Sequence, residues 1–225
     1  MNHSLAAVLW DLDGTLIDSE PYWMRTETEL VAEYGGRWTL DDAAASIGKS
    51  VPVTARIMRD KGVPLSVEEI TSELFTRMEQ RVLEDGLPYR PGALELLEEI
   101  HAEGLPQALV TMSFGAYVQA AVSATPRGAF STIRTGDSVP RSKPAPDIFL
   151  AAAADLSLAP AQCLGIEDSA AGAAAILAAG VTPLVIPGVG AVPDLPGLLR
   201  WETLAGVRLA DLRAAHAEYQ AATAR

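Results

Sequence analysis

Apolar residues recur along this chain in two alternating patterns. Short, mostly apolar runs cover residues 5–10, 107–111, 162–166 and 182–186, and a further short strand is expected near residues 132–135. Longer segments with apolar residues at three- and four-residue steps separate them. Such runs are typical of strands buried on both faces of a parallel sheet, and the segments between them are typical of helices. Strands that alternate with helices form right-handed βαβ units. The pattern therefore predicts an α/β fold with a Rossmann-like parallel sheet.

Residues 19–88 depart from this alternation because they show helical spacing only. Ser66 and Glu69 have the spacing of a capping box, and apolar residues follow them at helical steps as far as Gly86. We expect these helices to form an α-helical cap domain inserted into the sheet domain. The predicted division is a discontinuous Rossmann-like core of residues 1–18 and 89–225, with a cap of residues 19–88.

Composition excludes several classes of partner. The 225 residues carry a net charge of −12, which argues against binding to nucleic acid or to an anionic membrane. No basic leader precedes the first strand, and no apolar run approaches the ~18 residues of a membrane span. The single cysteine, Cys163, lies in an apolar run and fits a small core residue. We expect a cytoplasmic protein, monomeric or weakly dimeric.

Two carboxylates directly follow the first predicted strand. Asp11 and Asp13 are separated by one residue, and Gly14 comes next. Ligands of open α/β sheets bind at the carboxyl ends of the strands, so these side chains should face a site. Two carboxylates in one dry pocket repel each other unless a cation lies between them. Taken alone, the motif also fits an Asp-rich turn in which Gly14 has a positive φ.

Three later segments also place polar residues beyond apolar runs. Thr111 ends the second strand at a helix start, where a hydroxyl and free N–H groups favour an anion. Lys143 stands before two prolines, which would hold its ammonium in place for a phosphate. Glu167 and Asp168 follow the strand at 162–166 and add the oxygen ligands that Mg²⁺ prefers. Separately, each has an ordinary alternative: Thr111 as a cap, Lys143 as a solvated cation, and Asp168 or Ser169 as a helix cap.

Together, these four segments resemble the motifs of the haloacid dehalogenase-like superfamily in order and approximate spacing. They are Asp-Leu-Asp-Gly-Thr at 11–15, Thr111, Lys-Pro-Ala-Pro-Asp at 143–147 and Glu-Asp-Ser at 167–169. The resemblance covers the whole chain, including a helical cap after the first motif. It implies a Mg²⁺-dependent enzyme that transfers phosphoryl groups through an aspartyl-phosphate.

Carried over residue by residue, the resemblance assigns a role to each motif. Asp11 would be the nucleophile, and Asp13 would protonate the leaving group and then activate water. The implied phosphate-binding groups are Thr111, the Met112 backbone N–H and Lys143. The implied Mg²⁺ ligands are Asp11, the Asp13 carbonyl and Asp168, with Glu167 as a direct or water-mediated ligand.

Differences from related enzymes of the superfamily narrow the choice of reaction. Dehalogenases of this superfamily lack a second aspartate at the position of Asp13. Its phosphonate hydrolases need a lysine in the cap just after the first motif, and no lysine occurs between Asp18 and Gly35. The group that this chain most resembles holds β-phosphoglucomutase and the small-cap sugar and polyol phosphatases. The expected function is hydrolysis of small phosphomonoesters, with sugar or polyol phosphates first. Phosphoglycolate phosphatase and a β-phosphoglucomutase-type mutase are the alternatives, and a non-enzymatic binding protein ranks last because no motif carboxylate or lysine is lost.

Cap residues bear on the choice between hydrolase and mutase. In the mutases a histidine stands at the position of Trp23, and an arginine at the position of Val51. Both departures favour hydrolysis, because this chain lacks the histidine and the arginine that would hold a second phosphate in a mutase. Lys49 is a candidate replacement for the arginine, with a solvated lysine as the alternative. Trp23 is a candidate lid over the substrate or a core residue of the cap, and Glu20 is a candidate substrate contact.

Overall fold

The computed structural model describes residues 4–46 and 50–223. Strands and helices alternate as the sequence pattern predicts, except in the helical segment after the first strand. In chain order the elements are β1 (Ala7–Trp10), α1 (Glu20–Glu33), α2 (Leu40–Ser46), α3 (Val51–Asp60), α4 (Val67–Asp85), α5 (Ala93–Ala102), β2 (Gln107–Val110), α6 (Gly115–Ser123), β3 (Thr132–Arg134), α7 (Asp147–Asp155), the 3₁₀ turn η1 (Pro160–Gln162), β4 (Cys163–Glu167), α8 (Ala170–Ala179), β5 (Thr182–Val185), β6 (Leu199–Arg200) and α9 (Leu209–Thr223).

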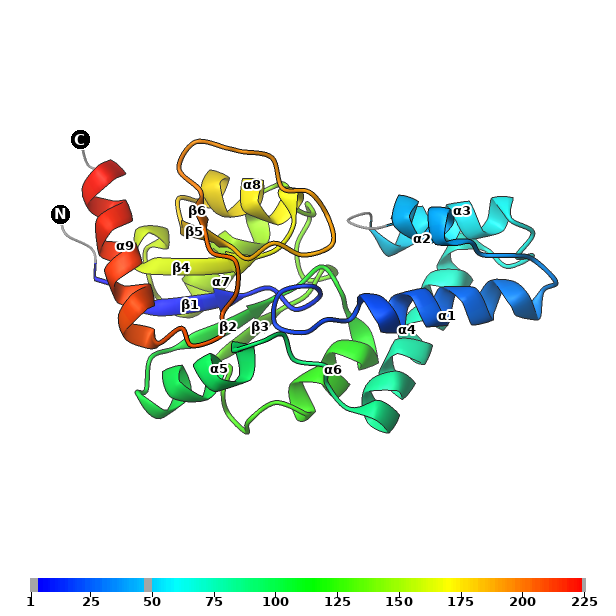
Figure 1. The fold of residues 1–225 in the computed structure, drawn as a ribbon, viewed down its shortest axis with the longest axis horizontal. Helices are drawn as coiled ribbons and strands as arrows, with labels where there is room; N and C mark the ends of the chain where they lie inside the picture. The colour runs from blue at the N-terminus through cyan, green and yellow to red at the C-terminus, as the bar shows by residue number, and fades with distance from the viewer. Residues whose placement is uncertain (1–3, 47–49, 224–225) are drawn as a thin grey trace. The chain divides into compact units, whose positions relative to one another are not determined.

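The strands of the described residues form one parallel sheet in the order β3-β2-β1-β4-β5-β6 (Figure 1). The chain leaves β1 toward β2 and β3 on one side, and returns through β4 to β5 and β6 on the other. The strand order therefore reverses at β1, which lies between β2 and β4. Open α/β sheets bind their ligands at the carboxyl ends of the strands at such a point. The predicted α/β, Rossmann-like fold is confirmed.

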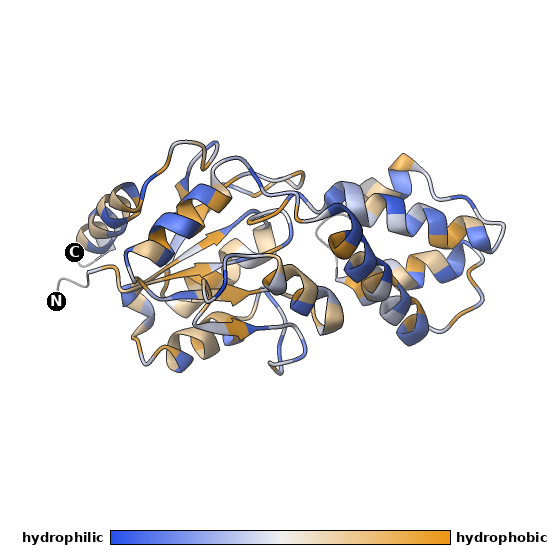
Figure 2. Cartoon of the chain, turned by 90° about the horizontal axis from the view of Figure 1, so that it is seen from below, coloured by the Kyte–Doolittle hydropathy of each residue, from blue (hydrophilic) through white to orange (hydrophobic). Residues whose placement is uncertain are grey.

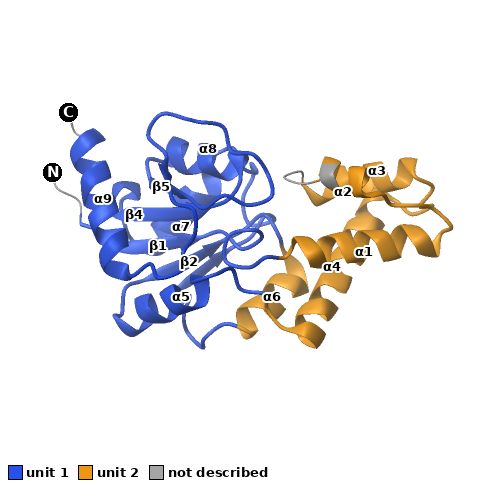
Figure 3. Ribbon diagram, viewed as in Figure 1, with its two compact units in different colours: residues 1–18, 88–113, 125–225 blue, residues 19–87, 114–124 orange. Residues whose placement is uncertain are grey.

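The chain divides into two compact units (Figure 3). The sheet unit comprises residues 1–18, 88–113 and 125–225, and the helical unit comprises residues 19–87 and 114–124. The helical unit thus includes α6, which the predicted core range of 89–225 contains. In the structure α6 packs against α4.

Most residues of the central strands of the sheet unit are apolar, as the orange parts of the strands in Figure 2 show. All residues of β1 are buried, and alternate side chains point to opposite faces. Ala7 and Leu9 join a core with Phe149 of α7 and Ile176 of α8. Trp10 is buried as well, and its indole N–H donates to the Gln107 side chain at 2.8 Å. This packing fixes the end of β1, where the first pair of carboxylates follows.

The helical unit has its own apolar core, formed by α1, α2, α3 and α4. The predicted capping box is confirmed: the Glu69 N–H donates to Ser66 Oγ at 3.1 Å, and the Ser66 N–H donates to Glu69 Oε2 at 2.8 Å. Within the described residues, no helix has both the length and the apolar character needed to cross a membrane.

An aromatic cluster attaches α6 to the rest of the helical unit. Trp23 of α1 meets Phe75 of α4 edge-on at 5.7 Å between ring centroids, and meets Tyr117 of α6 at 5.8 Å. Phe75 also contacts Phe114, which directly precedes α6, at 4.4 Å. Such ring pairs contribute roughly 0.5–1.5 kcal/mol each beyond the area that they bury. These contacts explain why α6 belongs to the helical unit.

Candidate active site

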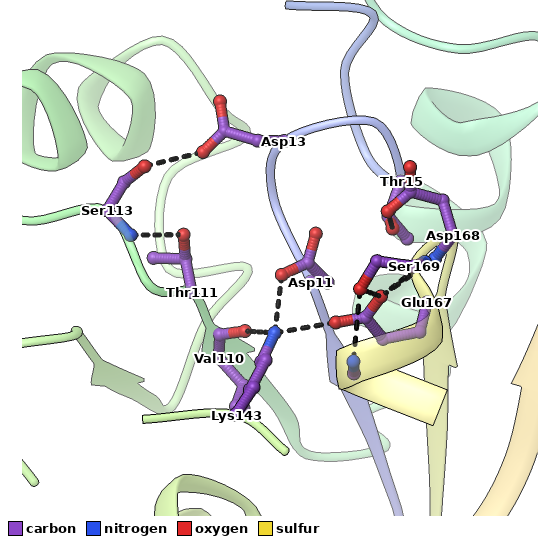
Figure 4. Close-up of polar contacts among 11 residues, drawn as sticks. Asp11, Asp13, Thr15, Val110, Thr111, Ser113, Lys143, Glu167, Asp168 and Ser169 are labelled. Atoms are coloured by element: carbon purple, nitrogen blue, oxygen red, sulfur yellow. Dashed lines mark hydrogen bonds and ion pairs between the residues drawn. The ribbon is translucent and has the colours of Figure 1, made fainter. Parts of the chain in front are cut away.

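The carboxyl ends of β1, β2 and β4 bring the motif residues of the sheet unit together (Figure 4). Trp10, the last residue of β1, pairs with Leu109 of β2 and with Ile166 of β4. Asp11 therefore follows β1 at the level where Glu167 ends β4. Asp11 and Glu167 are both buried, with 6% and 1% of their surface exposed.

Lys143 lies at the centre of this site. Its Nζ donates to Asp11 Oδ1 at 2.6 Å, to Glu167 Oε1 at 2.7 Å and to the Val110 carbonyl at 3.1 Å. The side chain is 5% exposed, and its ammonium lies 5.2 Å from the centre of the Phe149 ring. An ammonium has three N–H donors, so these contacts fix its position. Lys143 is thus not the solvated surface lysine that was the alternative interpretation.

Glu167 links Lys143 to the start of α8. Its Oε2 accepts hydrogen bonds from the N–H groups of Asp168 and Ser169, at 2.9 and 2.8 Å, and from Ser169 Oγ at 2.8 Å. A side chain at Gly172 would not fit, because a Cβ there would lie 1.7 Å from Glu167 Oε1. Since the other carboxylate oxygen faces Lys143, Glu167 holds the ammonium against a rigid helix terminus.

Helix capping does not account for Asp168. The cap of α8 is Ser169, whose Oγ accepts from the Gly172 N–H at 3.0 Å. Asp168 instead faces the loop after β1, where Thr15 Oγ1 donates to its Oδ1 at 3.3 Å. Gly14 has φ +85°, and a Cβ on it would lie 2.3 Å from Asp168 Oδ2. Glycine is therefore required at position 14 both for its conformation and for this close approach.

The loop after β2 holds Asp13. Ser113 Oγ donates to Asp13 Oδ2 at 2.6 Å, and the Ser113 N–H donates to Thr111 Oγ1 at 3.0 Å. Thr111 and Ser113 are buried, whereas Asp13 is only partly buried. Met112 lies between them, and its side chain packs against the apolar core of the sheet unit. The structure thus brings Thr111, Met112 and Asp13 together as expected, through a serine to which the sequence analysis gives no role.

Arg90 is a second residue that the sequence pattern did not single out. Its guanidinium donates to the Gly14 carbonyl at 2.5 Å and to the Pro187 carbonyl at 2.8 Å. These bonds tie the loop after β1 to the loop after β5. The only signal in the sequence is its position in the segment that leads from the helical insert back into the sheet domain.

Burial and crowding of like charges shift the titration of the site. Burial raises the pKa of Asp11 well above its ordinary value, and the Glu167 and Asp168 carboxylates raise it further against the opposing effect of Lys143. Burial, reinforced by Glu167, raises the pKa of Asp168 to about 7. Burial alone would lower the pKa of Lys143, but the adjacent Asp11 and Glu167 carboxylates raise it above its ordinary value. Lys143 therefore keeps its positive charge, and the unfavourable burial and crowding appear as raised pKa values of the Asp11 and Asp168 carboxyl groups.

The donor set fits a hard divalent cation. Asp11, Glu167 and Asp168 each offer a carboxylate oxygen, and these oxygens lie within 4.8 Å of one another. Oxygen ligands of this kind suit Mg²⁺, and a cation among them would offset the repulsion that raises the pKa of Asp11 and Asp168. The two oxygens of Glu167 already accept from Lys143 and from the start of α8, so Asp11 and Asp168 are the less engaged pair.

The cap candidates lie in the helical unit or outside the described residues. Glu20 begins α1 and is half-buried. Trp23 belongs to the aromatic cluster with Phe75 and Tyr117, as its core-packing interpretation requires. Lys49 falls in residues 47–49, outside the described ranges.

The parallel sheet thus carries a group of carboxylates and a buried lysine where its strand order reverses, the place where open α/β sheets bind ligands. The family model described as haloacid dehalogenase-like hydrolase matches residues 5–180. The chain therefore belongs to this family, and the resemblance seen in the sequence is confirmed.

Individual relatives carry phosphatase names. The chain is 34% identical over 185 residues to the bifunctional riboflavin kinase/FMN phosphatase of Arabidopsis thaliana, a match that covers 81% of this chain and 48% of that protein, so the chain spans about half its length. It is 33% identical to hexitol phosphatase A of Escherichia coli, covering 84% of this chain and 85% of the relative. Among solved structures, CbbY from Rhodobacter sphaeroides in complex with phosphate is 28% identical, with a TM-score of 0.82 over 92% of this chain and 99% of that one.

Proposed function

We propose that this chain is a Mg²⁺-dependent phosphatase that hydrolyses small phosphomonoesters, with sugar and polyol phosphates as the first candidates. The observation that carries the proposal is the Lys143 ammonium, which is fixed 2.6 Å from Asp11 Oδ1, with the Asp13 carboxylate two residues further along the chain. The hexitol phosphatase relative supports a polyol phosphate, and the phosphate complex of CbbY supports a phosphate ligand.

In the proposed reaction Asp11 is the nucleophile, and Asp13 is first the general acid and then the general base. An Asp11 oxygen attacks phosphorus, the ester bond to the leaving oxygen breaks, and Asp13 donates its proton to that oxygen. Asp13 then takes a proton from water, whose oxygen attacks the aspartyl-phosphate and releases inorganic phosphate and the Asp11 carboxylate. Ser113, which donates to Asp13 Oδ2, would orient the acid for both steps.

The remaining groups provide charge and position. Lys143, Thr111 and the Met112 N–H would hold the transferring phosphoryl oxygens. The groups that would hold Mg²⁺ are the Asp11 and Asp168 carboxylates and the Asp13 carbonyl, with Glu167 direct or through water. Bound there, the cation would neutralise charge that develops on the phosphoryl oxygens. Phosphoryl transfer depends mainly on such positioning and charge neutralisation.

Two alternatives share this chemistry. A mutase of the β-phosphoglucomutase type would need groups for a second phosphate, and Trp23 and Val51 stand where the mutases have a histidine and an arginine. A phosphoglycolate phosphatase differs in substrate only. A cytoplasmic location and a monomeric or weakly dimeric state stay predictions from the sequence.

The test is phosphate release from a panel of hexitol, pentitol and sugar phosphates and phosphoglycolate, with and without Mg²⁺. Asp11→Asn and Asp13→Asn should each abolish turnover, while Asp194→Asn, whose side chain is 99% exposed, should retain it. Turnover of Asp11→Asn near the wild-type rate would refute the assignment. Conversion of β-glucose 1-phosphate with a bisphosphate primer, faster than phosphate release, would favour the mutase.

A further inference from the structure

The Asp168 carboxylate lies between two backbone segments of the sheet unit, and each of them approaches it at a glycine. A Cβ on Gly14, in the loop after β1, would lie 2.3 Å from Asp168 Oδ2. A Cβ on Gly188, in the loop after β5, would lie 2.2 Å from the same oxygen. Both distances are shorter than a Cβ atom and an oxygen can approach, so the position of this carboxylate depends on where the two loops lie.

Arg90 joins these two loops. Its Nη1 donates to the carbonyl of Gly14 itself at 2.5 Å, and its Nη2 donates at 2.8 Å to the carbonyl of Pro187, the residue before Gly188. A guanidinium is planar and holds its N–H groups in a fixed geometry, so one that binds two carbonyls also fixes the spacing between them. The two hydrogen bonds therefore act directly at the glycines that flank Asp168.

The main chain of Arg90 is itself held in place within the sheet unit. Its N–H donates to the Leu16 carbonyl at 3.0 Å, and its carbonyl accepts from the Ala93 N–H, at the start of α5, at 3.0 Å. Pro91 follows it, and the ring of a proline fixes φ. The guanidinium therefore extends from a fixed backbone, as a group that positions other segments must.

We propose that Arg90 is a positioning residue for the cation site: by joining the loops at Gly14 and Pro187, it holds the Asp168 carboxylate where that group can bind a divalent cation. This inference rests on the proposed function, in which Asp168 is a ligand of Mg²⁺. A guanidinium is positively charged and has no acceptor atom, so Arg90 acts through the two loops and is not a ligand itself.

The charge of Arg90 and its positioning role predict opposite effects on cation binding. Burial raises the pKa of Asp168, and the positive charge of Arg90 is among the effects that oppose this rise, so the charge acts on the carboxylate. A positive charge close to a cation site repels the cation. Removal of Arg90 would thus strengthen cation binding if its charge were the larger effect, and it weakens binding if its positioning role is. The sign of the change distinguishes the two.

The experiment measures binding of Mn²⁺, which suits the same oxygen ligands as Mg²⁺, in the absence of any substrate. The electron paramagnetic resonance signal of free Mn²⁺ falls as the ion binds, so the Kd is obtained without catalysis. Arg90→Met should raise the Kd about tenfold, because loss of a group that orients metal ligands typically costs ~10–100-fold in affinity. Arg90→Lys keeps the charge but loses the planar geometry, and should raise the Kd at least about threefold. Arg213→Met removes the same charge from an exposed position of α9 and should bind Mn²⁺ as wild type does.

Gly188→Ala tests the same geometry without a change in charge. Gly188 does not have a positive φ, so alanine meets the contact with Asp168 rather than a backbone restriction. The added methyl group should displace the carboxylate and raise the Kd for Mn²⁺ about tenfold. The unfolding temperature in EDTA shows whether each variant folds, and Gly188→Ala and Arg90→Lys provide the test if Arg90→Met does not.

The outcomes separate this inference from the proposed function. Mn²⁺ binding by Arg90→Met that is unchanged or tighter would overturn the positioning role and leave the phosphatase proposal standing, and so would a wild type that does not bind Mn²⁺ but still releases phosphate. Weaker Mn²⁺ binding in the Arg90 and Gly188 variants, with no phosphate release by the wild type from any substrate, would refute the phosphatase proposal and support the positioning role.

Discussion

Glu27 is a buried carboxyl group in the helical unit that the proposed reaction does not use. It is 6% exposed, and Trp38 Nε1 donates to its Oε2 at 3.0 Å. Burial raises the pKa of Glu27 from 4.5 to about 7; the hydrogen bond from Trp38 opposes this shift, and the nearby Glu20 carboxylate adds to it. Glu27→Gln replaces the carboxyl group with a neutral amide of the same shape, whose oxygen can still accept from Trp38.

The sign of the effect follows from proton binding. Between pH 4.5 and pH 7 the folded protein binds a proton at Glu27 that the unfolded chain has lost. The stabilisation from this group is therefore fully present below pH 4.5, and it is lost as the pH rises through 7. At ~1.4 kcal/mol for each pKa unit, the shift corresponds to about 3 kcal/mol. Wild type should lose this amount relative to Glu27→Gln, most of it between pH 5 and pH 8.

The assay is urea unfolding at pH 5 and pH 8, followed by tryptophan fluorescence. Glu27→Gln should be more stable than wild type at pH 8, by about 2.5 kcal/mol more than any difference at pH 5, because a small part of the loss has already occurred by pH 5. Glu84→Gln makes the same chemical change at an exposed position of α4 and should stay within about 0.5 kcal/mol of wild type. If the stability difference between wild type and Glu27→Gln is the same at both pH values, the argument from burial is wrong.

Four further predictions concern the site and the scaffold. Lys143→Met leaves the Asp11 and Glu167 carboxylates buried without their cation, so unfolding in urea should show a loss of about 3–5 kcal/mol and phosphate release should cease. Ser113→Ala should lower kcat about tenfold with little change in KM in phosphate-release assays, because it leaves Asp13 less well oriented. Ser66→Ala should cost about 1 kcal/mol of stability in urea and leave kcat unchanged, because it removes a helix cap. Chelation with EDTA should abolish phosphate release and Mg²⁺ should restore it, at a higher concentration for Asp168→Asn than for wild type; unchanged activity in EDTA would exclude the metal.

The sequence predicted those features that depend on local patterns. An apolar run buried on both faces identifies β1 without knowledge of its neighbours, and a capping box identifies the start of α4. Asp11 and Asp168 were found because each lies just beyond an apolar strand, and parallel strands place their carboxyl ends at one edge. Lys143 was found because two prolines follow it.

Features that depend on contacts between distant segments were not predictable in this way. Ser113 and Asp13 are 100 residues apart, and nothing near Ser113 distinguishes it from an ordinary helix-start serine. The place of α6 in the helical unit depends on rings from three separate helices or their ends, including Trp23 and Phe75. The strand β6 comprises only Leu199 and Arg200, which is too short for any periodicity to appear.

The charges of the candidate site argue for function rather than for stability. The carboxylates of Asp11, Glu167 and Asp168 lie close together, and the ammonium of Lys143 contacts the first two. Burial and the crowding of negative charge raise the pKa of Asp11 and Asp168. A protein selected only for stability would gain from apolar residues of similar volume, since buried ion pairs often cost as much as they return. Capping of α8 by Ser169 and the glycines at 14 and 172 show that the surrounding chain is shaped to keep these carboxylates in place. A cation bound among these carboxylates would offset their repulsion, and the proposed chemistry would take place in that state.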